Sequence, residues 1–115
     1  MTQGDARKVC KAANSHLVEI NSAEEQAAIE AEIDRRGFTN RKIEFWLGIT
    51  DRQSEGTWVL ESNGESLPFS DWSAGEPNDR YSAEDCAHLD PFLNLKWNDR
   101  PCDSSVPHAL CQAQK

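Results

Sequence analysis

Three short clusters of oxygen-bearing side chains stand close together in the second half of the sequence. They are Glu76-Pro77-Asn78-Asp79, Glu84-Asp85 and Trp97-Asn98-Asp99. Calcium takes about six to eight oxygen ligands from carboxylates, amide carbonyls, backbone carbonyls and water. No single cluster supplies so many, but the three together do. We therefore predict that they converge on a calcium site.

The charge balance of the chain also favours a cation as partner. The sequence holds 20 acidic against 12 basic residues, a formal net charge of −8. Such a balance argues against a nucleic-acid backbone or an anionic membrane as the binding surface. An acidic stretch by itself is more often a solvated face. It is the combination with the three clusters that favours metal binding here.

Four cysteines are dispersed along the chain, at Cys10, Cys86, Cys102 and Cys111. No Cys-x-x-Cys pair is present, which argues against a structural zinc site. An even number of dispersed cysteines in a small domain predicts two disulfides and an oxidising compartment. We therefore expect a secreted or extracellular protein. No apolar run is long enough to span a membrane, and the residues after Met1 do not resemble a signal peptide.

The four cysteines allow three pairings, and their spacing alone does not choose among them. A bridge between Cys86 and Cys102 would bring Glu84-Asp85 and Asn98-Asp99 to one place. That choice leaves Cys10 to pair with Cys111, which would close nearly the whole chain.

The elements that must position these groups form an α+β pattern within one domain, residues 1–115. Helical spacing predicts helices over 5–13 and 23–36, the second with Ser22 and Glu25 as a capping box, Ala28, Ile29 and Ile33 inward, and Gly37 as its stop. Short strands are expected over 45–49, 57–60, 86–89, 95–97 and 108–111. The long polar segment 65–83 between them is typical of a functional loop.

Taken in order, these motifs resemble a C-type lectin carbohydrate-recognition domain. The resemblance rests on Phe45-Trp46-Leu47-Gly48-Ile49, on Glu-Pro-Asn at 76–78 and on Trp-Asn-Asp at 97–99, with four cysteines in register. It implies the C-type lectin-like fold, with two helices, small antiparallel sheets and a long calcium-binding loop.

The resemblance also implies two calcium sites. The principal site maps onto Glu76, Asn78, Glu84, Asn98 and Asp99. The auxiliary site of collectin-like members maps onto Asp51, Glu55, Asp79 and Asp85, and shares Glu84.

In the family, the order Glu-Pro-Asn accompanies sugars with equatorial 3- and 4-hydroxyls, namely mannose, N-acetylglucosamine and fucose. The expected sugar-binding residues are Glu76, Asn78, Glu84 and Asn98. Carboxylates accept hydrogen bonds and amides donate them. Each sugar hydroxyl can therefore donate one hydrogen bond to a carboxylate and accept one from an amide of this set. The expected ligands are mannose-type glycans, such as those of microbial surfaces in innate immunity. No catalytic residue is expected.

Relative to the family, the chain lacks or shortens a leading strand that normally pairs with the C-terminal one. Only nine residues precede Cys10, which puts the edge near 108–112 in doubt. A truncation, an unusually short natural chain or dimerisation through that edge would each account for it. Association into a homo-oligomer would also supply avidity.

Competing interpretations remain open from the sequence. The same fold could bind a protein, peptidoglycan or another surface, and calcium could be purely structural. A hydrolase would also use paired carboxylates, but no Ser-His or Cys-His pairing is visible. We expect Trp46 and Trp97 in the core, whereas Trp72 could be core or a sugar-stacking residue.

Overall fold

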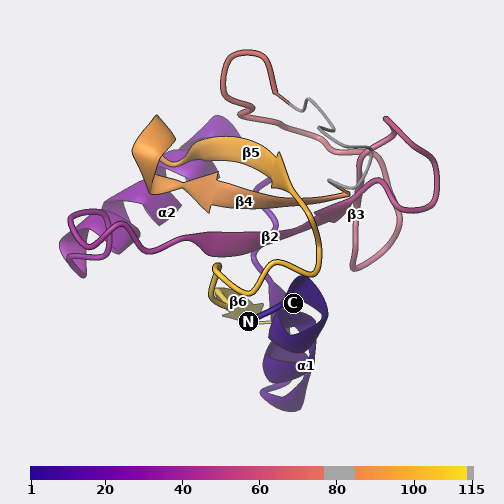
Figure 1. The fold of residues 1–115 in the computed structure, drawn as a ribbon, viewed down its shortest axis with the longest axis horizontal. Coiled ribbons are helices and arrows are strands. Elements are labelled where there is room, and N and C mark those ends of the chain that lie inside the picture. Colours follow the sequence, from indigo (N-terminus) through magenta and orange to yellow (C-terminus); the bar gives the residue numbers. More distant parts are fainter. Residues whose placement is uncertain (77–84, 114–115) are drawn as a thin grey trace.

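The computed structural model describes residues 1–76 and 85–113 of the chain. Their elements, in chain order, are α1 (Gln3–Ala12), β1 (Ser15–Leu17), α2 (Ala23–Arg35), β2 (Phe45–Thr50), β3 (Val59–Leu60), β4 (Cys86–Asp90), the 3₁₀ turn η2 (Pro91–Leu93), β5 (Lys96–Arg100) and β6 (Cys111–Ala113). In Figure 1, α1 lies below the main sheet, and α2 lies beside the end where β4 turns into β5. The expected α+β class and its antiparallel sheets are confirmed.

Helix α2 begins and ends where its local signals predict. Ser22 is the N-cap, and its Oγ accepts a hydrogen bond from the Glu25 backbone N–H at 3.1 Å. The return bond of the capping box differs from the expected one, because Glu25 Oε2 accepts from the backbone N–H of Asn21. Gly37 follows the helix with a φ of 77°, a conformation that glycine adopts without strain.

The inner face of α2 was predicted only in part. Ile33 is buried and Ile29 packs against the core, but Ala28 is exposed. Gln26 is buried instead, at 4% exposure. Its side chain accepts a hydrogen bond from Trp97 Nε1 at 2.9 Å and donates one to the carbonyl of Leu95 at 3.1 Å. These bonds offset the cost of burying an amide and attach α2 to the β4–β5 hairpin.

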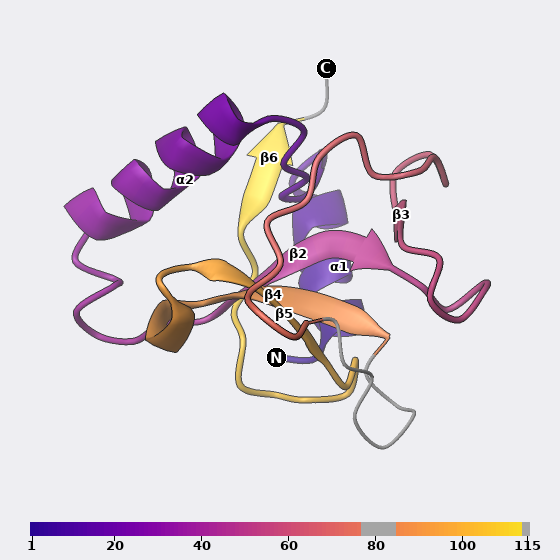
Figure 2. The ribbon, with the colours of Figure 1, turned by 90° about the horizontal axis from the view of Figure 1, so that it is seen from above.

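The main sheet has the strand order β3-β2-β4-β5. In β4 and β5, His88 pairs with Asn98 and Ala87 with Asp99, so the Trp-Asn-Asp motif lies in the middle of a strand. Trp46 and Trp97 are 0% and 1% exposed, which confirms their predicted place in the core. Figure 2 shows the same sheet from above, with α2 to one side and the segment that follows β3 running across the middle of the view.

A second, two-stranded sheet joins β1 to β6. Strand β6 begins at Cys111, three residues later than expected, and β1 was not predicted at all. The backbone before β6 is also paired: the Trp46 N–H donates to the His108 carbonyl, and the Val18 N–H donates to the Leu110 carbonyl. The stretch whose edge was in doubt is therefore hydrogen-bonded to β1 and β2.

Gly48, in the middle of β2, allows β1 to lie close to the main sheet. Its N–H donates to the Val18 carbonyl at 2.8 Å. A Cβ atom at this position would lie only 2.8 Å from the carbonyl oxygen of Leu17. A glycine is therefore required where the two sheets meet.

Both disulfides join the cysteine pairs that the sequence analysis predicted. Cys10 is bonded to Cys111, and Cys86 to Cys102. The first ties α1 to β6, and the second ties the start of β4 to the segment after β5. Cys10 and Cys86 are fully buried in one apolar cluster with Trp46.

Glu61, at the end of β3, provides a test of this packing. Burial raises the pKa of Glu61, although a hydrogen bond from Gln3 Nε2 and the nearby Arg7 act in the opposite direction. The folded chain therefore binds this proton more tightly than the unfolded chain, and the wild type loses stability as the pH rises through the folded pKa. We expect Glu61→Gln to have a higher melting temperature than the wild type at pH 7–8. Its unfolding free energy should be larger by less than about 1.5 kcal/mol.

Glu32 on α2 is the matched control, because its pKa shift has the opposite sign. Hydrogen bonds from Arg35 and Arg36 lower the pKa of Glu32 to about 2. Glu32→Gln should therefore melt below the wild type at neutral pH, and this difference should shrink as the pH falls. Thermal melts between pH 3 and pH 8 measure both. A Glu61→Gln variant less stable than the wild type at pH 8 would contradict the burial argument.

Candidate metal centre

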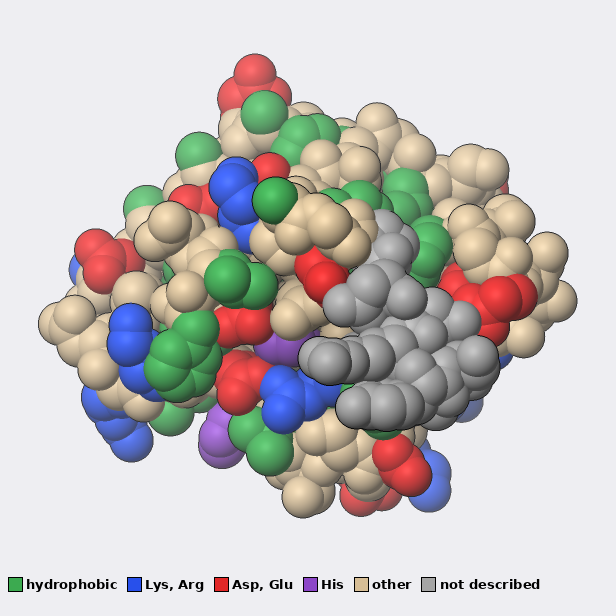
Figure 3. Space-filling view, turned by 45° about the horizontal axis from the view of Figure 1, so that its top comes forward, with side chains coloured by type: hydrophobic (Ala, Val, Ile, Leu, Met, Phe, Trp, Pro, Cys, Tyr) green, Lys and Arg blue, Asp and Glu red, His purple; other side chains and the backbone are tan. Residues whose placement is uncertain are grey.

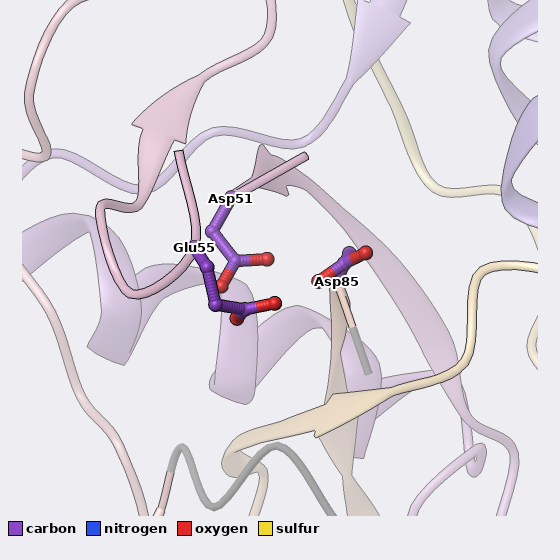
Figure 4. A group of neighbouring side chains, drawn as sticks. All are labelled: Asp51, Glu55 and Asp85. Atoms are coloured by element: carbon purple, nitrogen blue, oxygen red, sulfur yellow. The ribbon is translucent and has the colours of Figure 1, made fainter. Parts of the chain in front are cut away.

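Three carboxylates face one another at one end of the main sheet. One oxygen from each of Asp51, Glu55 and Asp85 lies within 4.8 Å of the others. Figure 4 shows the three side chains directed toward a common space, two from the segment after β2 and one from the residue before β4. These are three of the five residues predicted for the auxiliary calcium site.

Strand pairing brings these carboxylates together. Thr50, the last residue of β2, pairs with Cys86, the first residue of β4. The carbonyl of Asp85 accepts hydrogen bonds from the Asp51 backbone N–H at 3.2 Å and from Thr50 Oγ1 at 2.9 Å. Asp51 and Asp85 are therefore neighbours across the sheet. A tight turn then returns Glu55 to the same place, where the Gly56 N–H donates to Asp51 Oδ2 at 3.0 Å.

Asp51 is the member of this group whose environment best fits a cation. Asp51 is only 2% exposed. The Oδ1 atom is buried, and no hydrogen-bond donor within residues 1–76 and 85–113 reaches it. A buried carboxylate oxygen needs a partner, and close like charges repel. A divalent cation with oxygen ligands would satisfy both needs.

This arrangement predicts a specific effect of Asp51→Asn. Asparagine keeps an acceptor for the Gly56 N–H but removes one negative charge, so the metal-free variant should be at least as stable as the wild type. Calcium should raise the melting temperature of the wild type by several degrees and that of the variant much less. Melts in calcium and in EDTA measure this, with the exposed Asp34→Asn as control. An equal rise in both proteins would exclude Asp51 as a ligand.

A second group of predicted ligands lies on and beside β5. Asn98 is half-buried and Asp99 is 2% exposed. The segment that leads to Glu76 is bonded to the residue just before them. Trp97 N–H donates to the Asp71 carbonyl, and the Ser73 N–H donates to the Trp97 carbonyl, both at 2.9 Å. The Glu76 N–H donates in turn to the Ser73 carbonyl at 2.9 Å, so a short turn connects Glu76 to the residue that is bonded to Trp97.

Aromatic packing fixes this segment to the core. The Trp72 ring lies 4.9 Å from the Trp58 ring and 5.6 Å from the Trp97 ring, both in edge-on geometry. Trp97 is fully buried. Trp72, whose role the sequence left open, is half-buried and anchors the segment before Glu76.

The remaining predicted ligands, Asn78, Asp79 and Glu84, lie outside the described residues. The described residues that flank this segment are Glu76 and Asp85. Glu76 belongs to the group beside β5, and Asp85 belongs to the carboxylate cluster. The Cys86–Cys102 disulfide links the strand that follows Asp85 to the residues that follow Asp99. The described part of the site is thus supported on both sides by covalent or backbone bonds.

A buried polar network that the sequence analysis did not identify borders Asn98. His88 Nε2 lies 3.0 Å from Glu44 Oε1 and 3.5 Å from Asp90 Oδ2, and Arg100 Nη1 also contacts Glu44. Figure 3 shows acidic, basic and histidine side chains gathered on one face of the molecule. His88 is the main cause that lowers the pKa of Asp90, with the backbone N–H of Phe92 and the Asn98 amide acting in the same direction. The sequence signal for this network is the spacing of His88 and Asp90, because residues two apart on a strand point to the same face.

The large cavities of the described residues lie elsewhere. One of about 600 Å³ is lined by His16, Glu19, Ser62 and neighbouring residues. Both carboxylate oxygens of Glu19 accept hydrogen bonds from Ser62, at 3.0 and 2.8 Å. In the described part of the chain, the cluster of possible metal ligands is Asp51, Glu55 and Asp85, and none of these lines this cavity. Among the helices described, none is long and apolar enough to cross a membrane.

Comparison with known proteins gives a consistent result. A Perlucin-like protein of Mytilus galloprovincialis is 30% identical over 107 residues, which cover 93% of this chain and 67% of that protein. The carbohydrate-recognition domain of the mouse scavenger receptor C-type lectin superposes with a TM-score of 0.80 at 31% identity, over 99% of this chain and 82% of that one. The carbohydrate-recognition domain of cow CD23, solved in the presence of a GlcNAc2Man3 oligosaccharide, superposes with a TM-score of 0.77 at 29% identity. The superposition covers 100% of this chain and 82% of that one.

The chain spans 67% of the Perlucin-like protein and 43–49% of three further curated relatives, so it corresponds to a part of those proteins. The family model for the lectin C-type domain matches residues 1–113. This match covers both helices, both disulfides and all strands described above. The chain therefore belongs to the C-type lectin domain family, a family of binding modules.

Proposed function

We propose that the chain, residues 1–115, is a calcium-dependent carbohydrate-recognition domain for mannose-type sugars. The observation that carries the calcium part is the convergence of Asp51, Glu55 and Asp85, with a buried Asp51 oxygen that receives no hydrogen bond from any residue the structure describes. The sugar part is supported by the position of Asn98 and Asp99 in a rigid strand beside the segment that ends at Glu76. The mannose preference rests on the order Glu76-Pro77-Asn78.

The roles of the residues follow from their chemistry. The principal ion would be held by Glu76, Asn78, Glu84, Asn98 and Asp99, and it would supply coordination to two neighbouring sugar hydroxyls. Carboxylates accept a hydrogen bond from each hydroxyl, and asparagine amides donate one to it. Glu76 with Asn78 would serve one hydroxyl, and Glu84 with Asn98 the other. The second ion, held by the three clustered carboxylates with Asp79 and the shared Glu84, would stabilise the loop that carries these groups.

Such a site has consequences for affinity. A single shallow contact buries little sugar surface, so one site should bind with a dissociation constant on the order of millimolar. Useful binding then requires several sites on one particle, supplied by a homo-oligomer or by other segments. We propose a secreted protein that recognises glycans, such as those of microbial surfaces. No catalytic role is proposed, because the carboxylates would be committed to calcium.

Retention on sugar resins tests the proposal. We expect the wild type to bind mannose-agarose in calcium, to be eluted by EDTA, and to pass through galactose-agarose. The Glu76→Gln, Asn78→Asp double variant exchanges the carboxylate and the amide, and should bind galactose in preference to mannose. Retention of the wild type on galactose alone would contradict the assignment of specificity.

A second function is favoured by one observation. The clustered carboxylates join the end of β2 to the start of β4, so an ion there could act as a structural link for a module that binds a protein, peptidoglycan or another surface. This alternative predicts that calcium raises the melting temperature while neither resin retains the protein. Retention that is abolished by both EDTA and free mannose distinguishes the proposed function from it.

A further inference from the structure

Asp90 occupies a rigid position at the end of β4, close to the proposed sugar site. It is 9% exposed. Its Oδ1 accepts a hydrogen bond from the Phe92 N–H at 2.9 Å, which caps the turn η2. Its backbone carbonyl accepts from the Leu95 N–H at 2.8 Å. The carboxylate is therefore fixed by the hairpin itself and has little freedom to reorient.

The second oxygen of this carboxylate faces Asn98. Asn98 Nδ2 lies 3.3 Å from Asp90 Oδ2 and donates to it. His88 is the direct partner of Asn98 across the sheet, and its Nε2 lies 3.5 Å from the same oxygen. The three side chains thus share one face of the β4–β5 hairpin, because residues two apart along a strand point the same way.

This contact selects one of the two orientations of the Asn98 amide. An ionised carboxylate only accepts hydrogen bonds, so it attracts the NH₂ end of the amide and repels the carbonyl end. With Nδ2 held toward Asp90, Oδ1 is directed to the opposite side. One hydrogen of Nδ2 is used by Asp90, and the other stays available for a further acceptor.

We propose that Asp90 is a positioning residue that orients the Asn98 amide for calcium and sugar binding. It holds Oδ1 ready as a metal ligand and leaves one Nδ2 hydrogen for a sugar hydroxyl. The inference rests on the proposed function, because Asn98 is a ligand only if that function is correct. Groups that orient a metal ligand in this way typically contribute about 10- to 100-fold to metal affinity.

Asp90→Asn tests the inference with little change of shape. Its amide oxygen can still accept from the Phe92 N–H, but its NH₂ group then faces the NH₂ group of Asn98. We expect calcium affinity, measured by isothermal titration calorimetry, to fall by about 10- to 100-fold and mannose retention to be lost. The melting temperature in EDTA should fall modestly, because the carboxylate contact with His88 is lost, but the variant should remain folded. The control is Asp71→Asn, which removes a carboxylate that contacts Lys96 on β5, the strand that carries Asn98.

A reversal of the hydrogen bond separates positioning from a purely structural role. In the Asp90→Asn, Asn98→Asp double variant, the amide donates from residue 90 and the carboxylate accepts at residue 98. Calcium affinity should return toward the wild-type value, because a carboxylate at 98 is also a calcium ligand. Mannose retention should not return, because this carboxylate cannot donate to a hydroxyl.

A readout without calcium completes the design. In the calcium-free wild type, the NMR signals of the Asn98 side-chain amide should show one proton protected from exchange, and this protection should vanish in Asp90→Asn. If the wild type binds calcium and mannose but Asp90→Asn binds both equally well, the positioning role is wrong. Failure of the double variant to regain calcium would also overturn it. A wild type that binds neither calcium nor mannose overturns the proposed function itself.

Discussion

Replacing Asp99 with asparagine is expected to abolish calcium-dependent retention on mannose while the chain stays folded. Asp99 is 2% exposed and lies in the middle of β5, paired with Ala87. In this position next to Asn98 its carboxylate is one of the five ligands proposed for the principal ion, and carboxylate oxygens are preferred calcium ligands. Loss of a direct ligand should weaken calcium binding by more than the roughly 10- to 100-fold typical of an orienting group.

Two measurements separate the loss of a ligand from a loss of folding. Calorimetric titration with calcium gives the affinity, and thermal melts in EDTA give the stability of the metal-free chain. Asparagine has nearly the same shape as aspartate and keeps one oxygen acceptor. We therefore expect the variant to unfold cooperatively in EDTA, with a melting temperature close to that of the wild type. Asp71→Asn should bind calcium and mannose normally. Full retention of Asp99→Asn on mannose would exclude Asp99 from the principal site.

The fold could be predicted where local signals and tertiary contacts agree. Helix α2 has an N-cap at Ser22 and a glycine stop at Gly37, and both act through the backbone of the residues around them. Its inner face could not be predicted from apolar spacing alone. Ala28 was expected in the core but is exposed, and the polar Gln26 is buried instead. Gln26 can be buried because Trp97 and Leu95 form hydrogen bonds with its side chain, and these exist only after the hairpin has packed on the helix.

The two-stranded sheet shows the same limit of local signals. Strand β1, Ser15–Leu17, has three residues and no pronounced β pattern. It forms because β6 lies beside it and because Gly48 allows close approach of the main sheet. The Cys10–Cys111 disulfide joins helix α1 to the first residue of β6. A strand that depends on a partner about 100 residues away leaves little trace in its own sequence.

For the site, the sequence predicted the side chains of Asp51, Glu55 and Asp85 as one group, and the structure brings these three together. The prediction was possible because Asp85 precedes a cysteine and because family resemblance supplied the distant residues. The orienting contact from Asp90 to Asn98 was not predicted. It depends on the register of β4 against β5 and on a hairpin closed by Asn94 and Leu95, both with positive φ. Neither feature follows from residue type alone.

Removal of the two disulfides should separate stability from metal binding. The Cys10–Cys111 bond closes a loop with a sequence separation of 101 residues, and the Cys86–Cys102 bond one of 16. In the chain-entropy description, loss of the long loop costs about 4.7 kcal/mol and loss of the short one about 3 kcal/mol. The Cys10→Ala, Cys111→Ala variant should therefore be the less stable of the two in EDTA.

Calcium affinity should show the opposite order. Cys86 directly follows Asp85, and Cys102 lies three residues after Asp99, so their bond holds both groups of proposed ligands in place. The Cys86→Ala, Cys102→Ala variant loses this constraint and must order the ligands when the ion binds, whereas the other variant keeps it. Urea denaturation in EDTA measures the first difference, and calcium titration at a temperature where both variants are folded measures the second. Equal calcium affinities in the two variants would mean that the backbone bonds of β4 and β5 position the ligands without help from the disulfide.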